Sequence, residues 1–105
     1  RIESNAEKAG SICDAIITSQ PGNLTFPILH RLCGPGLVVS EEECLRAMAL
    51  AFARLKIVIE PGGAVALAAA LFHPDQITGD TVVAVATGGN VDTPMFTRAL
   101  EAMTP

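Results

Sequence analysis

The residues best placed to do chemistry follow an apolar run near the C-terminal end of the sequence. Residues 82–86 read Val-Val-Ala-Val-Ala, and Thr87, Gly88, Gly89 and Asn90 come directly after them. An apolar run without polar alternation is typical of a strand buried on both faces of a parallel sheet, and open sheets of this class bind ligands at the carboxyl ends of their strands. The sequence therefore predicts a hydroxyl facing a ligand crevice, beside glycines that allow close backbone approach or a positive φ. A plain strand-to-helix connection without a ligand explains the same residues.

Two charged side chains, Glu60 and Lys56, could also take part in catalysis. Glu60 lies between Ile59 and Pro61, where burial of a carboxylate is costly unless a partner compensates its charge. Its simpler role is to interact with the free N–H groups of the helix that follows, and on the residues alone this role is favoured over catalysis. Apolar neighbours could lower the pKa of the Lys56 amine toward that of a Schiff-base lysine, but the end of a helix is the more ordinary place for it.

The cysteines and histidines do not form a recognisable metal or disulfide pattern. Cys13, Cys33 and Cys44 are widely spaced and odd in number, which argues against a closed disulfide framework and favours a reducing cytoplasm. Each is expected to be a small buried hydrophobic residue. His30 and His73 are isolated from carboxylates in metal-ligand spacing, so no metal site is predicted. We expect His30 on a helix surface and His73 in a loop.

Composition limits the class of protein and its partners. The chain has 105 residues, of which 50% are hydrophobic, and a mean hydropathy of +0.42. This hydrophobic content is high for one small domain, and it indicates burial against another chain, another domain or the rest of a longer polypeptide. The start at Arg1 also suggests such a piece. A net charge of −4 without a basic cluster argues against a nucleic-acid partner. The longest apolar stretch, residues 64–72, is too short to cross a bilayer, so no membrane partner is expected.

The sequence predicts an α/β fold with short parallel strands and packed helices. Residues 1–10 are mostly polar and are expected to form a linker or loop, so that residues 11–105 make up the folded unit. The segment 11–18 fits either a short strand or a packed loop. A short helix is expected over residues 25–33, and a brief strand over residues 37–39.

Local signals mark the later helices. Ser40 and Glu43 form a capping-box sequence that opens a helix running to about Leu55. Apolar residues recur along it at helical spacing and are expected to form its core stripe: Leu45, Met48, Phe52 and Leu55. A pair four residues apart, Glu42 and Arg46, is expected on another face. A buried, alanine-rich helix follows from Pro61, and Asp92 or Thr93 caps a last helix with Pro94 in its first turn.

Taken together, four stretches resemble one enzyme family in their order and spacing. Residues 11–92 look like the C-terminal portion of the fold-type II pyridoxal-phosphate enzymes, specifically the threonine/serine dehydratases, also known as threonine ammonia-lyases, and the related serine racemases. The matching stretches are Thr25-Phe26-Pro27-Ile28-Leu29, Val39-Ser40-Glu41-Glu42-Glu43, residues 55–65 (LKIVIEPGGAV) and Thr87-Gly88-Gly89-Asn90-Val91-Asp92. The resemblance covers nearly all of this chain, but it corresponds to only about the last third of a family member.

The resemblance implies a role for each candidate site residue. Thr87 takes the place of a serine whose hydroxyl faces the pyridine nitrogen of the cofactor, and a neutral hydroxyl does not force protonation of the ring as an aspartate would. Gly88, Gly89 and Asn90 would form the wall beside the ring. Glu60 resembles the glutamate that lies near the cofactor and the entrance to the active site.

The resemblance also implies what this chain lacks. Lys56 does not match the family's Schiff-base lysine, which lies in a Ser-Phe-Lys type motif of the N-terminal half, and no such motif occurs here. The glycine-rich phosphate loop and the loop for the substrate carboxylate are absent too, so we expect no catalytic residue in this chain and no activity from it alone.

The expected parent is therefore a threonine/serine dehydratase that converts a hydroxy amino acid to a 2-oxo acid and ammonia. It would be a cytoplasmic homo-oligomer with the N-terminal part of the same enzyme as its missing partner. Serine racemase and hydroxyaspartate dehydratase are alternatives within the family. A non-catalytic oligomerisation or binding domain, which would bury the apolar excess by self-association, is the alternative from another class.

Overall fold

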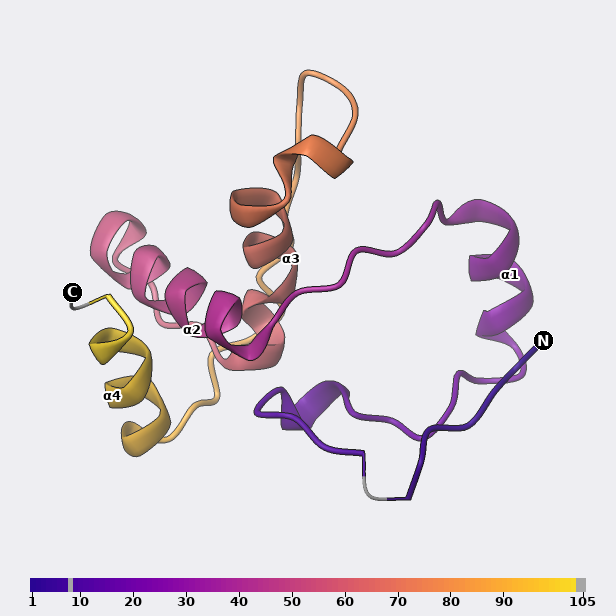
Figure 1. Ribbon diagram of the computed structural model, residues 1–105, viewed down its shortest axis with the longest axis horizontal. Coiled ribbons are helices and arrows are strands. Elements are labelled where there is room, and N and C mark those ends of the chain that lie inside the picture. Colours follow the sequence, from indigo (N-terminus) through magenta and orange to yellow (C-terminus); the bar gives the residue numbers. More distant parts are fainter. Residues whose placement is uncertain (8, 104–105) are drawn as a thin grey trace.

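Three helices form the centre of the molecule. The computed structural model describes residues 1–7 and 9–103, and in it α2 (Glu41–Leu50) packs against both α3 (Pro61–Phe72) and α4 (Thr93–Glu101) (Figure 1). The radius of gyration is 14.8 Å, whereas a compact domain of this length has about 13 Å. The chain is therefore more open than a self-contained domain.

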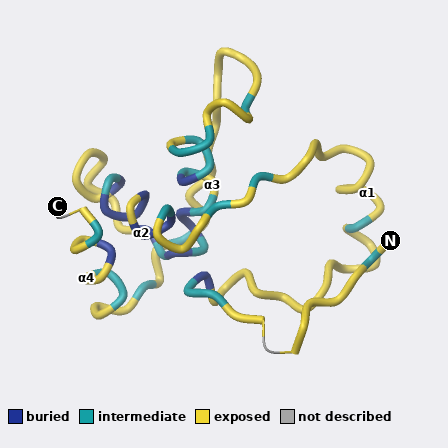
Figure 2. The backbone as a smooth tube through the Cα atoms, viewed as in Figure 1, coloured by how far each residue is buried: buried dark blue, intermediate teal, exposed yellow. Residues whose placement is uncertain are grey.

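The N-terminal part extends away from this centre. α1 (Thr25–Leu32) lies at the opposite side of the molecule and, among the described residues, contacts no other helix (Figure 1). The predicted helix over residues 25–33 is thus confirmed. The ambiguous segment 11–18 contains a single 3-10 turn, Asp14–Ile16, instead of a strand. Figure 2 shows burial confined mostly to the three central helices, while most of the N-terminal part is exposed.

The capping box at the start of α2 is confirmed. The Ser40 hydroxyl accepts a hydrogen bond from the Glu43 N–H at 3.1 Å, and the Glu43 carboxylate accepts one from the Ser40 N–H at 2.8 Å. These reciprocal bonds satisfy backbone donors that a helix start leaves free. The α-helix ends at Leu50 and continues as a π-helical turn, Ala51–Leu55, so the helical run reaches the residue expected.

The core stripe predicted for this helix is half wrong. Leu45 and Met48 are 5% and 0% exposed, but Phe52 and Leu55 are 39% and 62% exposed. The π turn is wider than an α turn, which changes the angular position of the residues in it. Phe52 instead packs edge-on against Phe96 of α4, with ring centroids 5.3 Å apart. The fully buried residues of α2 are mostly small, and Met48 and Cys44 are its largest.

The α3 helix is built for close packing. Its alanines Ala64 and Ala68 are fully buried, because a methyl side chain lets two helices approach closely. The Arg46 guanidinium of α2 lies 4.7 Å from the ring centroid of Phe72, at the end of α3, a cation–π arrangement. The predicted pair of Glu42 with Arg46 is not among the ion pairs of the described residues.

The predicted strands are not observed. No residue of the described ranges is in a strand, so the α part of the predicted α/β fold is present and the short parallel strands are not. In the run 82–86, Val82, Val83 and Val85 are 52%, 83% and 64% exposed. A strand forms only when a neighbour supplies the other half of its ladder hydrogen bonds, and the described residues offer no such neighbour along this run. It returns from the end of α3 toward α4 as an irregular segment (Figure 1).

The last helix starts as its sequence predicts. The Asp92 carboxylate caps α4 by accepting a hydrogen bond from the Met95 N–H at 2.9 Å, and Pro94 lies in the first turn. None of the described helices is both long enough and apolar enough to pass through a bilayer.

Candidate functional site

The glycine turn after the apolar run meets the start of α3. The Glu60 N–H donates a hydrogen bond to the Gly88 carbonyl oxygen at 3.0 Å, which joins two segments that are distant in sequence. A further bond within the turn, from the Val91 N–H to the Gly89 carbonyl at 2.9 Å, tightens it just before α4 begins. The predicted site residues Glu60 and Gly88 are thus neighbours in the fold.

The glycines are needed because the chain packs against itself here. A Cβ at Gly63, in the first turn of α3, would lie 2.5 Å from the Gly88 carbonyl oxygen, and one at Gly89 would collide with the Val58 carbonyl oxygen. Neither Gly88 nor Gly89 has a positive φ; among the described glycines that conformation occurs at Gly79. The prediction of close backbone approach is therefore confirmed, while the positive-φ alternative is wrong.

The Glu60 carboxylate does not cap the helix that it precedes. Glu60 is the N-cap residue of α3, but its side chain accepts no hydrogen bond from that helix. A Cβ added to Gly88 would lie 2.5 Å from Glu60 Oε1, so the carboxylate lies directly beside the turn. The hydrogen bond to the helix N–H groups that the simpler role implies is not formed, and the half-buried carboxylate lies beside the glycines.

The turn leaves a hydroxyl and a carboxylate free to bind a ligand. Thr87 is exposed, and within the described part of the chain neither its hydroxyl nor the Glu60 carboxylate appears in a side-chain hydrogen bond. Asn90 is exposed and lines a cavity of about 280 Å³, together with Asp14 and Asp92.

The charge around the turn decides which part of a ligand fits it. The carboxylates of Glu60, Asp14 and Asp92 lie on or near the turn, and no lysine or arginine of the described residues lines the cavity. A phosphate group would be repelled there. The same carboxylates favour a neutral or cationic group, and the Thr87 hydroxyl can donate or accept a hydrogen bond.

Lys56 ends the helical run and binds back onto it. It is the C-cap residue of the π turn, with a left-handed φ of 60°, and its Nζ donates a hydrogen bond to the Ala53 carbonyl at 2.9 Å. The interpretation of Lys56 as an ordinary helix-end residue is confirmed.

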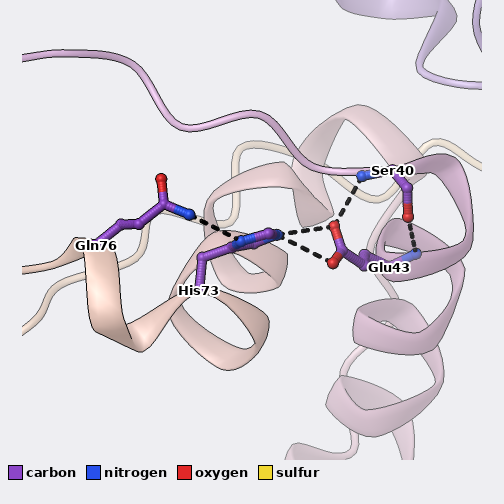
Figure 3. Close-up of polar contacts among 4 residues, drawn as sticks. All are labelled: Ser40, Glu43, His73 and Gln76. Atoms are coloured by element: carbon purple, nitrogen blue, oxygen red, sulfur yellow. Dashed lines mark hydrogen bonds and ion pairs between the residues drawn. The ribbon is translucent and has the colours of Figure 1, made fainter.

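A cluster between α2 and the end of α3 was not predicted from the sequence. The His73 Nε2 lies 3.0 and 3.1 Å from the two Glu43 carboxylate oxygens, and the Gln76 amide lies 3.3 Å from Nδ1 (Figure 3). An ionised carboxylate can only accept, so Nε2 donates to it and Nδ1 accepts from the amide. His73 was expected in a loop, and it lies directly after α3 as its C-cap residue. Its pairing with Glu43 was not predicted.

This cluster perturbs the titration of Glu43. The hydrogen bond from the Ser40 N–H, followed by the bond from His73, holds the pKa of the Glu43 carboxyl below its ordinary value of 4.5. The sequence indicated one of the two hydrogen bonds that lower this pKa, since the capping box identifies Glu43 as a partner of Ser40. The other hydrogen bond, from His73, is a tertiary contact between residues far apart in the chain, which no local pattern encodes.

The cysteines divide into two kinds. Cys13 and Cys44 are buried, with their sulfur atoms 3.9 Å apart, and burial raises the pKa of the Cys44 thiol to about 12. Such a thiol is inert as a nucleophile. Cys33 is exposed, so the prediction that every cysteine is buried is wrong for it, because it follows α1 where no other element covers the chain. Within the described ranges no three His, Cys, Asp or Glu residues form a metal-binding group.

Comparison with known proteins points to one family. A model of the family described as "Pyridoxal-phosphate dependent enzyme" matches residues 2–88. An L-threo-3-hydroxyaspartate ammonia-lyase of Pseudomonas sp is 36% identical over 91 residues, which are 87% of this chain and 28% of the relative. A serine racemase of Dictyostelium discoideum is 38% identical, covering 89% of this chain and 29% of the relative.

A solved structure gives the same result for the fold. The crystal structure of the T.th. threonine deaminase superposes with a TM-score of 0.81 and 39% sequence identity, covering 88% of this chain and 31% of that chain. The chain thus spans less than a third of the length of each of these proteins.

Proposed function

Because this chain belongs to the family of pyridoxal-phosphate dependent enzymes, we propose that it is the C-terminal part of the large domain of a fold-type II ammonia-lyase. The full-length protein removes water from a β-hydroxy amino acid such as threonine or serine and releases a 2-oxo acid and ammonia. The observation that carries the proposal is the turn of residues 87–90, packed against Glu60 and Gly63 with its hydroxyl exposed.

The side chains around the turn fit one edge of the cofactor. When bound, pyridoxal phosphate supplies an electron-withdrawing ring that stabilises negative charge on the amino-acid substrate. The exposed Thr87 hydroxyl would donate a hydrogen bond to the ring nitrogen, and Gly88, Gly89 and Asn90 would form the wall beside it. Glu60 lies next to this wall and faces the entrance. The carboxylates near the turn favour the ring over the phosphate at this edge.

The neutral hydroxyl of Thr87 has a chemical consequence. A carboxylate in its place would favour a protonated ring nitrogen, because an adjacent negative charge raises the pKa of a cationic acid. A hydroxyl hydrogen-bonds the nitrogen without adding charge. Both β-elimination and racemisation can run with this weaker electron sink.

The proposal requires a larger protein. A cofactor of this kind needs an amine to hold it and donors for its phosphate, and we assign neither to this chain. Residues 1–10 would be a linker and residues 11–105 part of the catalytic domain. The remaining parts of the site come from the N-terminal portion of the same enzyme, which we propose to be a cytoplasmic homo-oligomer with a small amino-acid substrate.

The test uses the full-length protein, purified and supplied with pyridoxal phosphate. L-threonine, L-serine and L-threo-3-hydroxyaspartate are offered separately, and ammonia, 2-oxo acid and D-serine are measured. Release of equal amounts of ammonia and 2-oxo acid from one of these substrates supports the proposal. Formation of D-serine as the main product would assign the racemase alternative, and absence of cofactor binding would reject the enzyme proposal in favour of a non-catalytic binding domain.

The 105-residue chain alone provides the complementary measurement. We expect it to show no ammonia release and no lasting absorbance change with pyridoxal phosphate, because the cofactor-holding amine lies elsewhere. A stable covalent adduct of this chain with the cofactor, located by mass spectrometry on Lys56, would contradict the assignment.

A further inference from the structure

We propose that Gly63 is a positioning residue for the candidate site. The Gly88 carbonyl occupies the place that a Cβ of residue 63 would take, and the position of Gly88 sets that of Thr87. The inference rests on the proposed function, since it concerns how the turn is held for its cofactor. Gly63 is buried in the first turn of α3, so it acts through Gly88 and not by contact with a ligand.

The first observation is the lack of room at this position. A Cβ at Gly63 would lie 2.5 Å from the Gly88 carbonyl oxygen and 3.1 Å from the Gly88 nitrogen. Optimal nonbonded contacts between heavy atoms lie at roughly 3.5 Å or more. Both obstructing atoms belong to the backbone, so they cannot turn aside as the end of a side chain can. An alanine here must displace the turn or the helix.

Nothing else about the position calls for glycine. Gly63 has no positive φ, and glycine is a poorer helix former than alanine within a helix. The preference of α3 by itself would therefore favour alanine, as at the next position, where Ala64 is fully buried. The contact with Gly88 is the feature of the structure that requires the missing side chain.

Displacement of Gly88 is transmitted to the groups that face the ligand. The Gly88 carbonyl accepts the hydrogen bond from the Glu60 N–H at 3.0 Å, and the Glu60 carboxylate lies against the Gly88 Cα. Moving this carbonyl breaks or lengthens that bond and separates Glu60 from the turn. Thr87 is covalently joined to Gly88, so its hydroxyl moves with it.

The neighbouring glycine provides a matched control. A Cβ at Gly62 would lie 3.4 Å from Ile16 Cγ2, an ordinary contact with a side chain that is 51% exposed. Gly62 and Gly63 are adjacent in the same helical turn, so alanine brings a similar gain in helix preference at either position. Any difference between Gly62→Ala and Gly63→Ala reports the contact with Gly88.

The experiment compares the two variants in the full-length protein. Pyridoxal phosphate is titrated while the absorbance spectrum of the bound cofactor is recorded, and hydrogen exchange of the Glu60 amide is measured without cofactor. We expect Gly62→Ala to bind within about twofold of the wild type, whereas Gly63→Ala binds at least about tenfold more weakly, with a shifted cofactor spectrum. The Glu60 amide should also exchange at least about tenfold faster in Gly63→Ala.

The outcomes separate this inference from the proposed function. If the wild type binds no pyridoxal phosphate, the proposed function fails and the positioning role fails with it. If the wild type binds but Gly63→Ala has the affinity and spectrum of Gly62→Ala, only the positioning role is overturned. A lower melting temperature with an unchanged affinity and spectrum would also overturn it, because it would show a structural role alone.

A measurement on the wild type covers the case in which Gly63→Ala does not fold. The Glu60 amide should become more protected from exchange when pyridoxal phosphate binds, because the cofactor fixes the turn that supplies its acceptor. Amides of α2, which packs against α3 and α4, serve as the internal reference. Equal protection of the Glu60 amide with and without cofactor would overturn the proposal.

Discussion

At the scale of single residues, the charge state of position 87 offers a direct test of the proposed site. Replacing Thr87 by aspartate in the full-length protein puts a negative charge where the proposed site has a neutral hydroxyl against the ring nitrogen, which would favour ring protonation. We expect a changed absorbance spectrum of the bound cofactor and a loss of elimination rate of about tenfold or more. Spectra of the loaded protein and ammonia release at saturating substrate measure the two effects.

Thr87→Ser is the matched control, because it keeps the hydroxyl and removes one methyl group. Its spectrum should equal that of the wild type, and its turnover should stay within about threefold. An unchanged spectrum in Thr87→Asp would show that this side chain does not face the ring.

Glu43 is a second residue whose charge can be tested, through the dependence of stability on pH. Hydrogen bonds from the Ser40 N–H and from His73 hold its pKa below the ordinary value of 4.5. Because the folded-state pKa is depressed, the stabilisation is complete above pH 4.5 and disappears as the pH falls through the lower folded value. The wild type should therefore melt above Glu43→Gln at neutral pH, and the difference should shrink in acid.

His73→Ala separates the two partners of Glu43 in the same melting experiment. It removes the contact with α3 but leaves the bond from the Ser40 N–H, which makes the larger contribution to the lowered pKa. Its loss of melting temperature should be smaller than that of Glu43→Gln. A melting difference for Glu43→Gln that grows as the pH falls below 4.5 would contradict this account.

At the scale of helices and strands, local signals explain what the sequence could predict. The capping box of Ser40 and Glu43 and the cap at Asp92 act within a single turn, so their hydrogen bonds appear in the structure as expected. The run of residues 82–86 depends on neighbouring strands that are distant in sequence, and it remains irregular. The contact of Gly63 with Gly88 was not predicted for the same reason, although both glycines were visible in the sequence.

The cap of α4 gives a prediction for one element. Asp92→Ala removes the acceptor of the Met95 N–H, and a lost N-cap costs a helix about 1 kcal/mol. The amides of α4 in the full-length protein should then exchange about fivefold faster, provided that exchange occurs by local opening of this helix. Hydrogen exchange with mass spectrometry measures it peptide by peptide.

Asp92→Asn is the control for this prediction, because an asparagine side chain caps a helix about as well as an aspartate. Its α4 amides should exchange at nearly the wild-type rate. Equal acceleration in both variants would attribute the effect to the lost charge near the cavity instead of the cap.

At the scale of the whole molecule, the exposed apolar surface is consistent with a part of a larger fold. Large hydrophobic side chains are exposed along both segments that lead to the site, including Val58 at 46% and Val83 at 83%. The sequence indicated this through its hydrophobic content, and the chain covers less than a third of each reported relative. The glycine turn of residues 87–90 could be singled out from the sequence, whereas its packing against Glu60 and Gly63 could not.

The run of residues 82–86 should therefore change its state between the chain alone and the full-length protein. In the 105-residue chain, kept dilute enough to be monomeric, its amides should exchange nearly as fast as those of an unstructured peptide, because no ladder hydrogen bond protects them. In the full-length protein the same amides should be among the most protected, since a strand buried on both faces opens only with its sheet. Amides of α2, which has its own core contacts, should be protected in both samples. Strong protection of the run in the monomeric chain would mean that this segment already has its hydrogen-bond partners, so no further chain would be needed around it. Fast exchange in the full-length protein would mean that the run forms no strand there, which would leave Thr87 at the end of a loop.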